Sequence, residues 1–288
     1  MEYQVIQKWL NRLSIEIKLK RYSTETLDCY VSFLKKFLIH FSSKIEPSHI
    51  STIEIKQFML LFEKHPAQYK QLLATLRFFY INIIHQPEKL KSIRYIRWEP
   101  KLPTIIDRQI LIDRIFAIKD ERYKVFYSLL YSTGLRVAEG CRLRITDFNK
   151  ERRTITVRMG KGGKDRIVPY SKVLAEMLNH YHQNYHLKDS IWLFEGINRM
   201  NYISKSTVQR LSRGYLKTNC HNLRHCYAVH MLEMGVSIYT LKELLGHKDI
   251  HTTEIYLRCI NPNYNIPQNV LIDVKEKKAL EFIPGIAA

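Results

Sequence analysis

The chain contains few cysteine, glycine and proline residues, and each of these low counts excludes a class of protein. Its 288 residues include 5 Cys, 10 Gly and 9 Pro. The cysteines are odd in number and never spaced as Cys-x-x-Cys, which argues against a disulfide framework and a cysteine zinc site and favours a reducing compartment. So little Gly and Pro excludes collagen-like or low-complexity material.

Long apolar runs are also missing. No stretch approaches the roughly 18 apolar residues that a membrane span needs. The start, Met1–Gln4, is not followed by the apolar region of a secretory signal. We therefore expect a cytoplasmic protein with no membrane contact.

Acidic residues are fewer than basic ones. Asp and Glu total 27 against 46 Lys and Arg, which gives a formal net charge of +19, and both halves of the chain are basic. Hydrophobic residues make up 45% of the chain, which excludes a disordered basic tail. A folded, strongly basic protein favours a polyanionic partner, nucleic acid first, although charge alone also fits proteins that never meet DNA.

Apolar residues in the first hundred positions recur at three- and four-residue steps, which predicts helices. Ser51 and Glu54 form the pattern of a capping box before the third helix. Pro100 and Pro103 then interrupt the periodicity and predict an extended linker. The expected organisation is a bundle of four helices over 1–93, a linker over 94–104 and a second domain over 105–288.

The second domain has a mixed pattern. Residues 154–159 and 165–169 alternate like two strands around the Gly-rich tip 160–164, which predicts a β-hairpin with basic residues at its turn. Further helices are predicted over 106–117, 121–133, 172–186, 206–216, 221–234, 238–245, 251–257 and 269–280, with Gly134, Gly235 and Gly246 as helix stops. The predicted fold class is mainly α, with a small β-hairpin or sheet in the second domain.

Two clusters place cations at turns. Arg136 follows the glycine stop at 134 and precedes a new helix, where a guanidinium can face a phosphate. The alternative is an exposed arginine paired with Glu139. Lys161 and Lys164 lie at the hairpin tip, which lacks the spacing of a Walker A loop. A flexible tip can deliver a Lys to a leaving oxygen, and solvated lysines on a tight turn are the alternative.

Two further clusters contain histidines. His221 and Arg224 share one helix face, and His225 stands four residues after His221 at the spacing of a helical zinc site. That metal interpretation lacks a convincing third ligand. His247 follows a glycine stop, and Tyr256 lies on the next short helix, where a core or interface role is the alternative.

Taken together, the clusters resemble the tyrosine recombinase (phage integrase) family. The motifs are T-G-L-R-V-A-E, G-K-G-G-K-D-R-I-V-P, H-N-L-R-H and L-L-G-H-K-D-I-H-T-T-E-I-Y, and the resemblance covers essentially the whole chain. It implies that 1–93 is a SAM-like DNA-core-binding domain and that 105–288 is the catalytic domain with a C-terminal tail. It places six catalytic positions at Arg136, Lys161, His221, Arg224, His247 and Tyr256. Asn222 and Cys226 depart from the family pattern, which commonly has Asp and Thr or Ser there.

The resemblance implies a site-specific DNA recombinase that uses Tyr256 as nucleophile, through a 3′-phosphotyrosyl link, with no cofactor and no metal. Arg136 and Arg224 would bind the nonbridging oxygens, Lys161 would protonate the leaving oxygen and His221 would assist proton transfer with Tyr256. His247 would hydrogen-bond a phosphate oxygen, and the surrounding cations are expected to favour ionised Tyr256.

The implied partners are double-stranded DNA and a homotetramer, or paired recombinases, on two duplexes. The segment 263–288 is expected to dock onto a neighbouring protomer. The biological role is either mobile-element integration and excision or Xer-type chromosome dimer resolution. Alternatives are a type IB topoisomerase, a DNA-binding protein without catalysis and a metal-dependent hydrolase.

Overall fold

The computed structural model describes residues 3–44, 46–96, 102–158, 165–185, 190–196 and 201–260. Contacts divide the chain into two compact units, residues 1–100 and 101–288. The division falls inside the segment predicted as a linker, whose described parts carry neither helix nor strand. Within the described ranges, no helix is long and apolar enough to cross a membrane.

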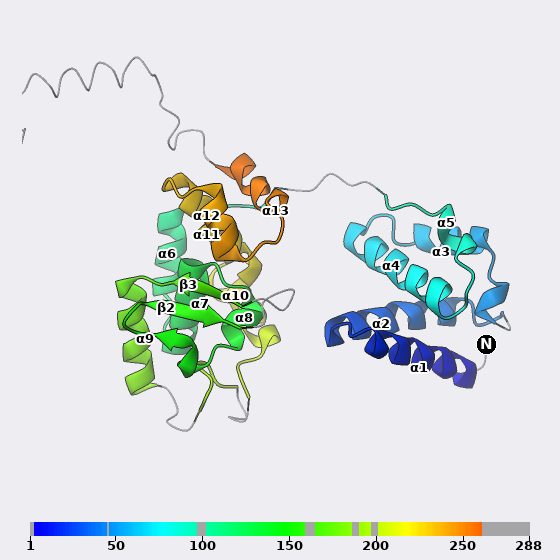
Figure 1. The fold of residues 1–288 in the computed structure, drawn as a ribbon, viewed down its shortest axis with the longest axis horizontal. Helices are drawn as coiled ribbons and strands as arrows, with labels where there is room; N and C mark the ends of the chain where they lie inside the picture. The colour runs from blue at the N-terminus through cyan, green and yellow to red at the C-terminus, as the bar shows by residue number, and fades with distance from the viewer. Residues whose placement is uncertain are drawn as a thin grey trace, which may run out of the picture. The chain divides into compact units, whose positions relative to one another are not determined.

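The first unit is a helical bundle, as predicted (Figure 1). Its elements are α1 Tyr3–Leu19, α2 Thr24–His40, the 3-10 helix η1 Pro47–His49, α3 Thr52–Leu60, α4 Pro66–Asn82 and α5 Glu88–Lys91. The predicted capping box is present, because the Ser51 amide donates to Glu54 Oε2 over 2.9 Å and the Glu54 amide donates to Ser51 Oγ over 3.3 Å. One face of each long helix is buried, with Leu13 and Leu34 fully enclosed.

The second unit is mostly helical. Its helices are α6 Arg108–Phe116, α7 Glu121–Thr133, α8 Val137–Cys141, η2 Ile145–Asp147, α9 Lys172–Asn184, α10 Lys205–Tyr215, α11 Cys220–Glu233, α12 Ile238–Leu245, α13 His251–Glu254 and η3 Ile255–Cys259. Helix α7 packs against α6, α8, α9 and α11, so it forms the centre of this unit. Its Phe126 and Tyr127 are fully buried.

A three-stranded antiparallel sheet in the order β1-β2-β3 accompanies these helices. The predicted hairpin is β2 Thr154–Val157 paired with β3 Arg166–Pro169, and its tip, residues 159–164, lies outside the described residues. The additional strand β1, Phe148–Asn149, pairs with β2 and was missed by the sequence analysis. The predicted fold class, mainly α with a small sheet, is confirmed.

The segment that carries Tyr256 differs from its prediction. The expected helix over 251–257 is one turn of α-helix, α13, which continues as the 3-10 helix η3, so Tyr256 stands on the tighter turn. The helix predicted over 269–280 and the tail expected to dock onto a neighbour lie outside the described residues.

Candidate active site

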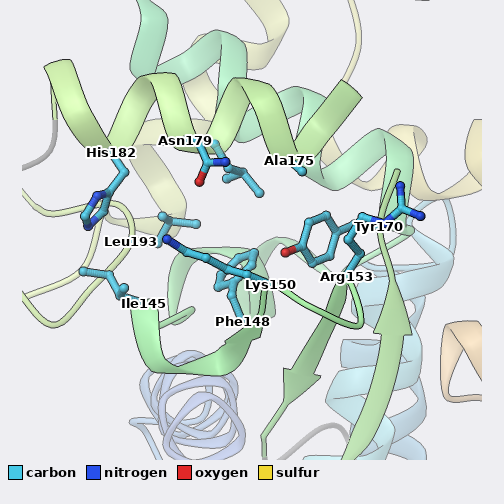
Figure 2. Close-up of a pocket in the computed structure, with 10 residues that line it drawn as sticks. Ile145, Phe148, Lys150, Arg153, Tyr170, Ala175, Asn179, His182 and Leu193 are labelled. Atoms are coloured by element: carbon cyan, nitrogen blue, oxygen red, sulfur yellow. The ribbon is translucent and has the colours of Figure 1, made fainter. Parts of the chain in front are cut away.

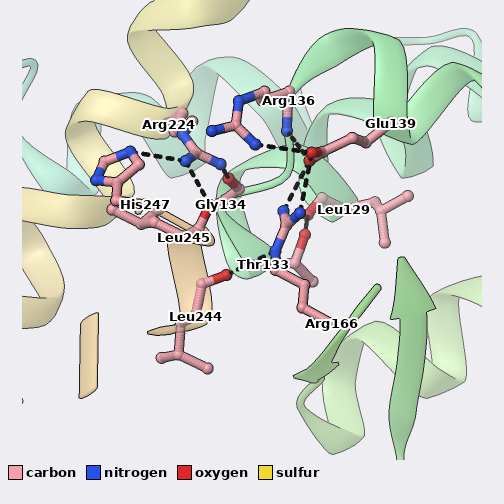
Figure 3. A network of polar contacts seen from close by, with 10 residues as sticks. All are labelled: Leu129, Thr133, Gly134, Arg136, Glu139, Arg166, Arg224, Leu244, Leu245 and His247. Carbon is pink, nitrogen blue, oxygen red and sulfur yellow. Dashed lines mark hydrogen bonds and ion pairs between the residues drawn. The ribbon is translucent and has the colours of Figure 1, made fainter. Parts of the chain in front are cut away.

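Arg224 lies at the centre of the candidate site, and only 2% of its surface is exposed. Its Nη1 donates to the carbonyl of Gly134 over 2.7 Å, and its Nη2 donates to the carbonyl of Leu245 over 2.6 Å (Figure 3). Nη2 also lies 2.9 Å from Nε2 of His247. Burial and the nearby Arg136 lower the pKa of Arg224 to about 10, so the guanidinium remains charged at neutral pH.

Both carbonyls belong to helix C-termini. Gly134 caps α7 with φ +64°, and Leu245 is the last residue of α12, which Gly246 caps with φ +64°. Unpaired carbonyls at a helix C-terminus carry partial negative charge, so two helix ends stabilise the buried cation. A Cβ on Gly134 would lie 2.4 Å from Cδ1 of Tyr227, so the close packing of α7 against α11 requires glycine there.

His247 is fixed from two sides. Arg224 can only donate, so Nε2 of His247 is the acceptor of their contact. The neutral ring then carries its proton on Nδ1, which lies 2.9 Å from Oγ1 of the buried Thr253 in α13. Burial, followed by Arg224 and Arg136, lowers the pKa of His247 to about 4. The imidazole is therefore neutral near pH 7 and holds the orientation of Arg224.

Arg136 and Arg166 share one carboxylate, that of Glu139 (Figure 3). Arg136 donates from its amide over 2.8 Å and from Nη1 over 2.9 Å. Arg166 makes a bidentate pair over 2.9 and 2.7 Å, while its Nε donates to the carbonyl of Leu244 over 3.1 Å. Although burial alone would raise the pKa of Glu139, the hydrogen bonds from both arginines hold it at about 2.

Tyr256 is 3% exposed. Its hydroxyl lies 3.1 Å from Nδ1 of His225, and its ring stacks at 18° against the ring of His247 with centroids 6.5 Å apart. Burial raises the pKa of Tyr256 more than Arg224 and Arg136 lower it. The two arginines thus favour the ionised phenol, as expected, but in the DNA-free protein the desolvation of the phenol outweighs them.

His221 lies in the first turn of α11 and is exposed. Its ring meets the ring of His225 edge to face, with centroids 4.4 Å apart. Partial burial, Arg224 and Arg136 lower its pKa. The side chain that contacts the Tyr256 hydroxyl is that of His225 rather than that of His221.

The structure thus gathers five of the six predicted residues: Arg136, His221, Arg224, His247 and Tyr256. Lys161 lies outside the described residues, in the tip of the hairpin whose strand β3 supplies Arg166. The three guanidinium groups exceed the single carboxylate of Glu139 by two positive charges. Such a cluster suits a phosphate, whose charge spreads over several oxygens.

The cavity in Figure 2 lies elsewhere, between α9 and the segment around β1. Its lining includes Lys150, Tyr170 and Asn179, and none of the five described site residues takes part. Converging polar groups, not cavity size, therefore define the candidate site. Among the residues that the structure describes, no group of three His, Cys, Asp or Glu side chains is placed to hold a metal ion.

Comparison with known proteins assigns the family. Residues 109–261 match the phage integrase family, and residues 9–89 match the N-terminal SAM-like domain of phage integrases. The chain belongs to the phage integrase family. The expected enzyme class, a tyrosine-type site-specific recombinase, is thereby confirmed.

Individual proteins that are similar to this recombinase support the family assignment. Tyrosine recombinase XerA of Pyrococcus furiosus is 33% identical over 279 residues, which cover 88% of this chain and 89% of that protein. Tyrosine recombinase XerC of Thermodesulfovibrio yellowstonii is 32% identical, with 87% and 90% covered. A crystal structure of a lambda integrase dimer bound to a core site has a similar fold, with a TM-score of 0.70 at 20% identity over 87% of this chain and 94% of that chain.

The two departures of this recombinase from the family pattern contact each other. Asn222 and Cys226 are one helical turn apart, and Nδ2 of Asn222 donates to Sγ of Cys226 over 3.9 Å. The amide of Ile106 donates to the same sulfur over 3.5 Å. Both side chains are buried. Through the sulfur of Cys226, they link α11 to the segment that precedes α6.

Two residues of the site were missed. Arg166 alternates in phase with the buried Val168, while Ile167 between them is 65% exposed. An arginine on the inward face of a strand beside an outward isoleucine is the signal that would have found it. His225 was considered only as a metal ligand, although its spacing from His221 already placed both rings on one helix face.

Proposed function

We propose that this recombinase cuts double-stranded DNA by attack of the Tyr256 hydroxyl on a backbone phosphodiester. The products are a 3′-phosphotyrosyl link and a free 5′-hydroxyl, and the 5′-hydroxyl of a partner strand reverses the step. The observation that carries this proposal is the position of Tyr256 in a site with excess positive charge. Its hydroxyl contacts His225, and its ring stacks against His247, which in turn contacts Arg224. The ester bond energy is kept in the covalent link, so the reaction needs no cofactor.

The arginines suit the nonbridging oxygens of the phosphate. Three of the five N–H donors of Arg224 have partners among the described residues, which leaves two for a ligand. Arg136 lies closer to solvent, with a quarter of its side chain exposed, and its remaining donors have no partner among the described residues, so they can bind a second oxygen. These charges stabilise the transition state without a metal ion.

The remaining roles are proposed from the motifs. Lys161 protonates the leaving 5′-oxygen. A bound phosphate offsets the positive charge of the arginines, which allows His247 to gain a proton and donate to a phosphate oxygen. His221, exposed in the first turn of α11, contributes to proton transfer.

We further propose that both basic domains hold the duplex, joined by the linker 94–104, and that binding weakens steeply with salt. The DNA-bound lambda integrase of similar fold supports a DNA partner. Exchange between two duplexes requires four strands to be cut, so the proposed assembly is a homotetramer, or paired recombinases, in the cytoplasm.

The test is a denaturant-resistant protein–DNA adduct formed in EDTA on nicked duplexes that trap the covalent state. The DNA pool combines fragments of the source genome, including the gene's own locus, with duplexes carrying known chromosome dimer-resolution sites. Wild type is compared with Tyr256→Phe and with the matched control Tyr239→Phe, which alters an exposed tyrosine of α12.

We expect adducts with wild type and Tyr239→Phe and none with Tyr256→Phe. An adduct that survives in Tyr256→Phe would refute the assignment of the nucleophile, and tight binding without any adduct would indicate a DNA-binding protein without catalysis. The recovered DNA identifies the role, because a dimer-resolution site supports the Xer-type role and the gene's own flanks support a mobile element.

A further inference from the structure

The contact between His225 and Tyr256 assigns a role to a residue outside the six predicted positions. Nδ1 of His225 lies 3.1 Å from the Tyr256 hydroxyl, and the two rings are 5.6 Å apart. Helix α11, which carries His225, packs against η3, which carries Tyr256. The contact is therefore built from two packed elements, and its interpretation below rests on Tyr256 being the nucleophile.

The direction of this hydrogen bond follows from burial. Among the described residues, His225 is the hydrogen-bond partner that the Tyr256 hydroxyl has. If Nδ1 carried a proton, the phenol would accept and its own buried proton would lack an acceptor, which is costly. The favoured arrangement has the phenol donate to the lone pair on Nδ1, so the bond points in the direction of proton transfer.

The surroundings keep that lone pair available. The titratable groups that face His225 are His221 and Arg224 on its own helix, Tyr256 from η3 and His247 from the loop after α12. Burial, followed by His221 and Arg224, lowers the pKa of His225 to about 4, so the ring is neutral near pH 7. A phosphodiester bound at Arg224 brings a negative charge that opposes these effects, so His225 becomes a stronger base when the substrate is present.

We propose that His225 is the catalytic residue that accepts the proton of Tyr256 during strand cleavage. The bond between Oη and phosphorus forms as the O–H bond of Tyr256 breaks and its proton moves to Nδ1 of His225. The bond from phosphorus to the 5′-oxygen breaks, and that oxygen receives a proton from the general acid proposed at Lys161. In rejoining, the 5′-oxygen bonds to phosphorus and its proton returns to the general acid proposed at Lys161. The bond between phosphorus and Oη breaks, and the proton on Nδ1 returns to Oη.

The first measurement compares His225→Asn with His230→Asn in single-turnover cleavage of the nicked duplex recovered in the adduct assay. Asn retains a polar group near the position of Nδ1 but cannot take the proton. His230 is the matched control, because it lies on the same helix and its Nδ1 is 2.7 Å from the hydroxyl of another tyrosine, Tyr131. Loss of a general base typically lowers the rate by about 10²–10⁴-fold, which we expect for His225→Asn alone.

A rescue experiment separates proton transfer from a structural effect. A fluorinated tyrosine of lower pKa is placed at position 256 in the wild-type and His225→Asn backgrounds. Because a more acidic phenol needs less help from a base, we expect it to restore at least about tenfold of the lost rate in His225→Asn and to change wild type little. With ordinary tyrosine, the cleavage rate of His225→Asn should also rise with pH as the phenol ionises.

Each outcome decides the question. Wild-type cleavage by His225→Asn, or a loss that the fluorinated tyrosine does not restore, would overturn the role of His225. Adduct formation by Tyr256→Phe would instead overturn the proposed nucleophile. Thermal unfolding and DNA binding are measured for every variant, and His225→Gln undergoes the same two tests if His225→Asn does not fold.

Discussion

Glu139 is the only carboxylate in the charged part of the described site, and its removal gives a quantitative test of how the arginines are held. Glu139→Gln keeps the size of the side chain but leaves Arg136 and Arg166 facing a neutral amide. The amide oxygen still accepts one bond from Arg166, whereas the bidentate charged pair over 2.9 and 2.7 Å is lost. We expect loss of stability in the second unit together with loss of cleavage.

The magnitude follows from the pKa of Glu139, which the arginines hold at about 2 against an ordinary value of 4.5. At about 1.4 kcal/mol per pKa unit, the ionised form gains about 3 kcal/mol of stability from its surroundings. Because the folded pKa lies below the unfolded pKa, this contribution is complete above pH 5 and is lost as the pH falls toward 2. The deficit of Glu139→Gln should therefore be about 3 kcal/mol at pH 7 and shrink to roughly half at pH 3.

Hydrogen exchange followed by mass spectrometry measures this deficit, because peptides from α7 and from β3 report unfolding of the second unit alone. Glu243→Gln is the matched control: it removes the same charge from an exposed pair with Lys242 and should change little. A deficit below about 1 kcal/mol at pH 7, or one that does not shrink in acid, would refute the reasoning.

Two further predictions concern the same unit. Gly134→Ala should destabilise it in thermal unfolding by about 1–2 kcal/mol from the left-handed backbone alone, and by more because the new methyl group clashes with Tyr227. Gly235→Ala is the control: Gly235 has φ +86° but open space around it, so only the backbone cost should appear. The second prediction concerns pH. The folded protein holds the pKa values of His225 and His247 at about 4, so as the pH drops from about 6.5 to 4 these side chains bind protons in the unfolded chain before they do so in the folded protein. The melting temperature should therefore fall over this range, and less steeply in His247→Asn.

Local patterns predicted most of the fold. The helices of both units follow from apolar periodicity, and the start of α3 follows from the capping box of Ser51 and Glu54. Strand β1 was missed because two residues are too short to show alternation, and its pairing with β2 depends on tertiary contact. The 3-10 turn under Tyr256 was missed because side-chain periodicity does not separate one tight turn from the end of an α-helix.

The candidate site depended on the family resemblance, because sequence spacing does not bring Arg136 to Arg224. The resemblance did not indicate which of His221 and His225 contacts the Tyr256 hydroxyl. Both rings share one face of α11, and only the packing of η3 against that helix decides which ring meets the Tyr256 hydroxyl. Such a choice depends on how two helices pack, which motif spacing does not encode.

The way in which Arg224 is stabilised explains how a buried cation stays useful for catalysis. A carboxylate partner would neutralise it, as Glu139 partly neutralises Arg136 and Arg166. The partners of Arg224 are instead neutral: two carbonyls at helix C-termini and the lone pair of His247. Their dipoles offset the cost of burial while the whole positive charge remains available to a phosphate. A lysine at 224 would carry the same charge but, without the planar fork, would not reach both helix ends and a phosphate together.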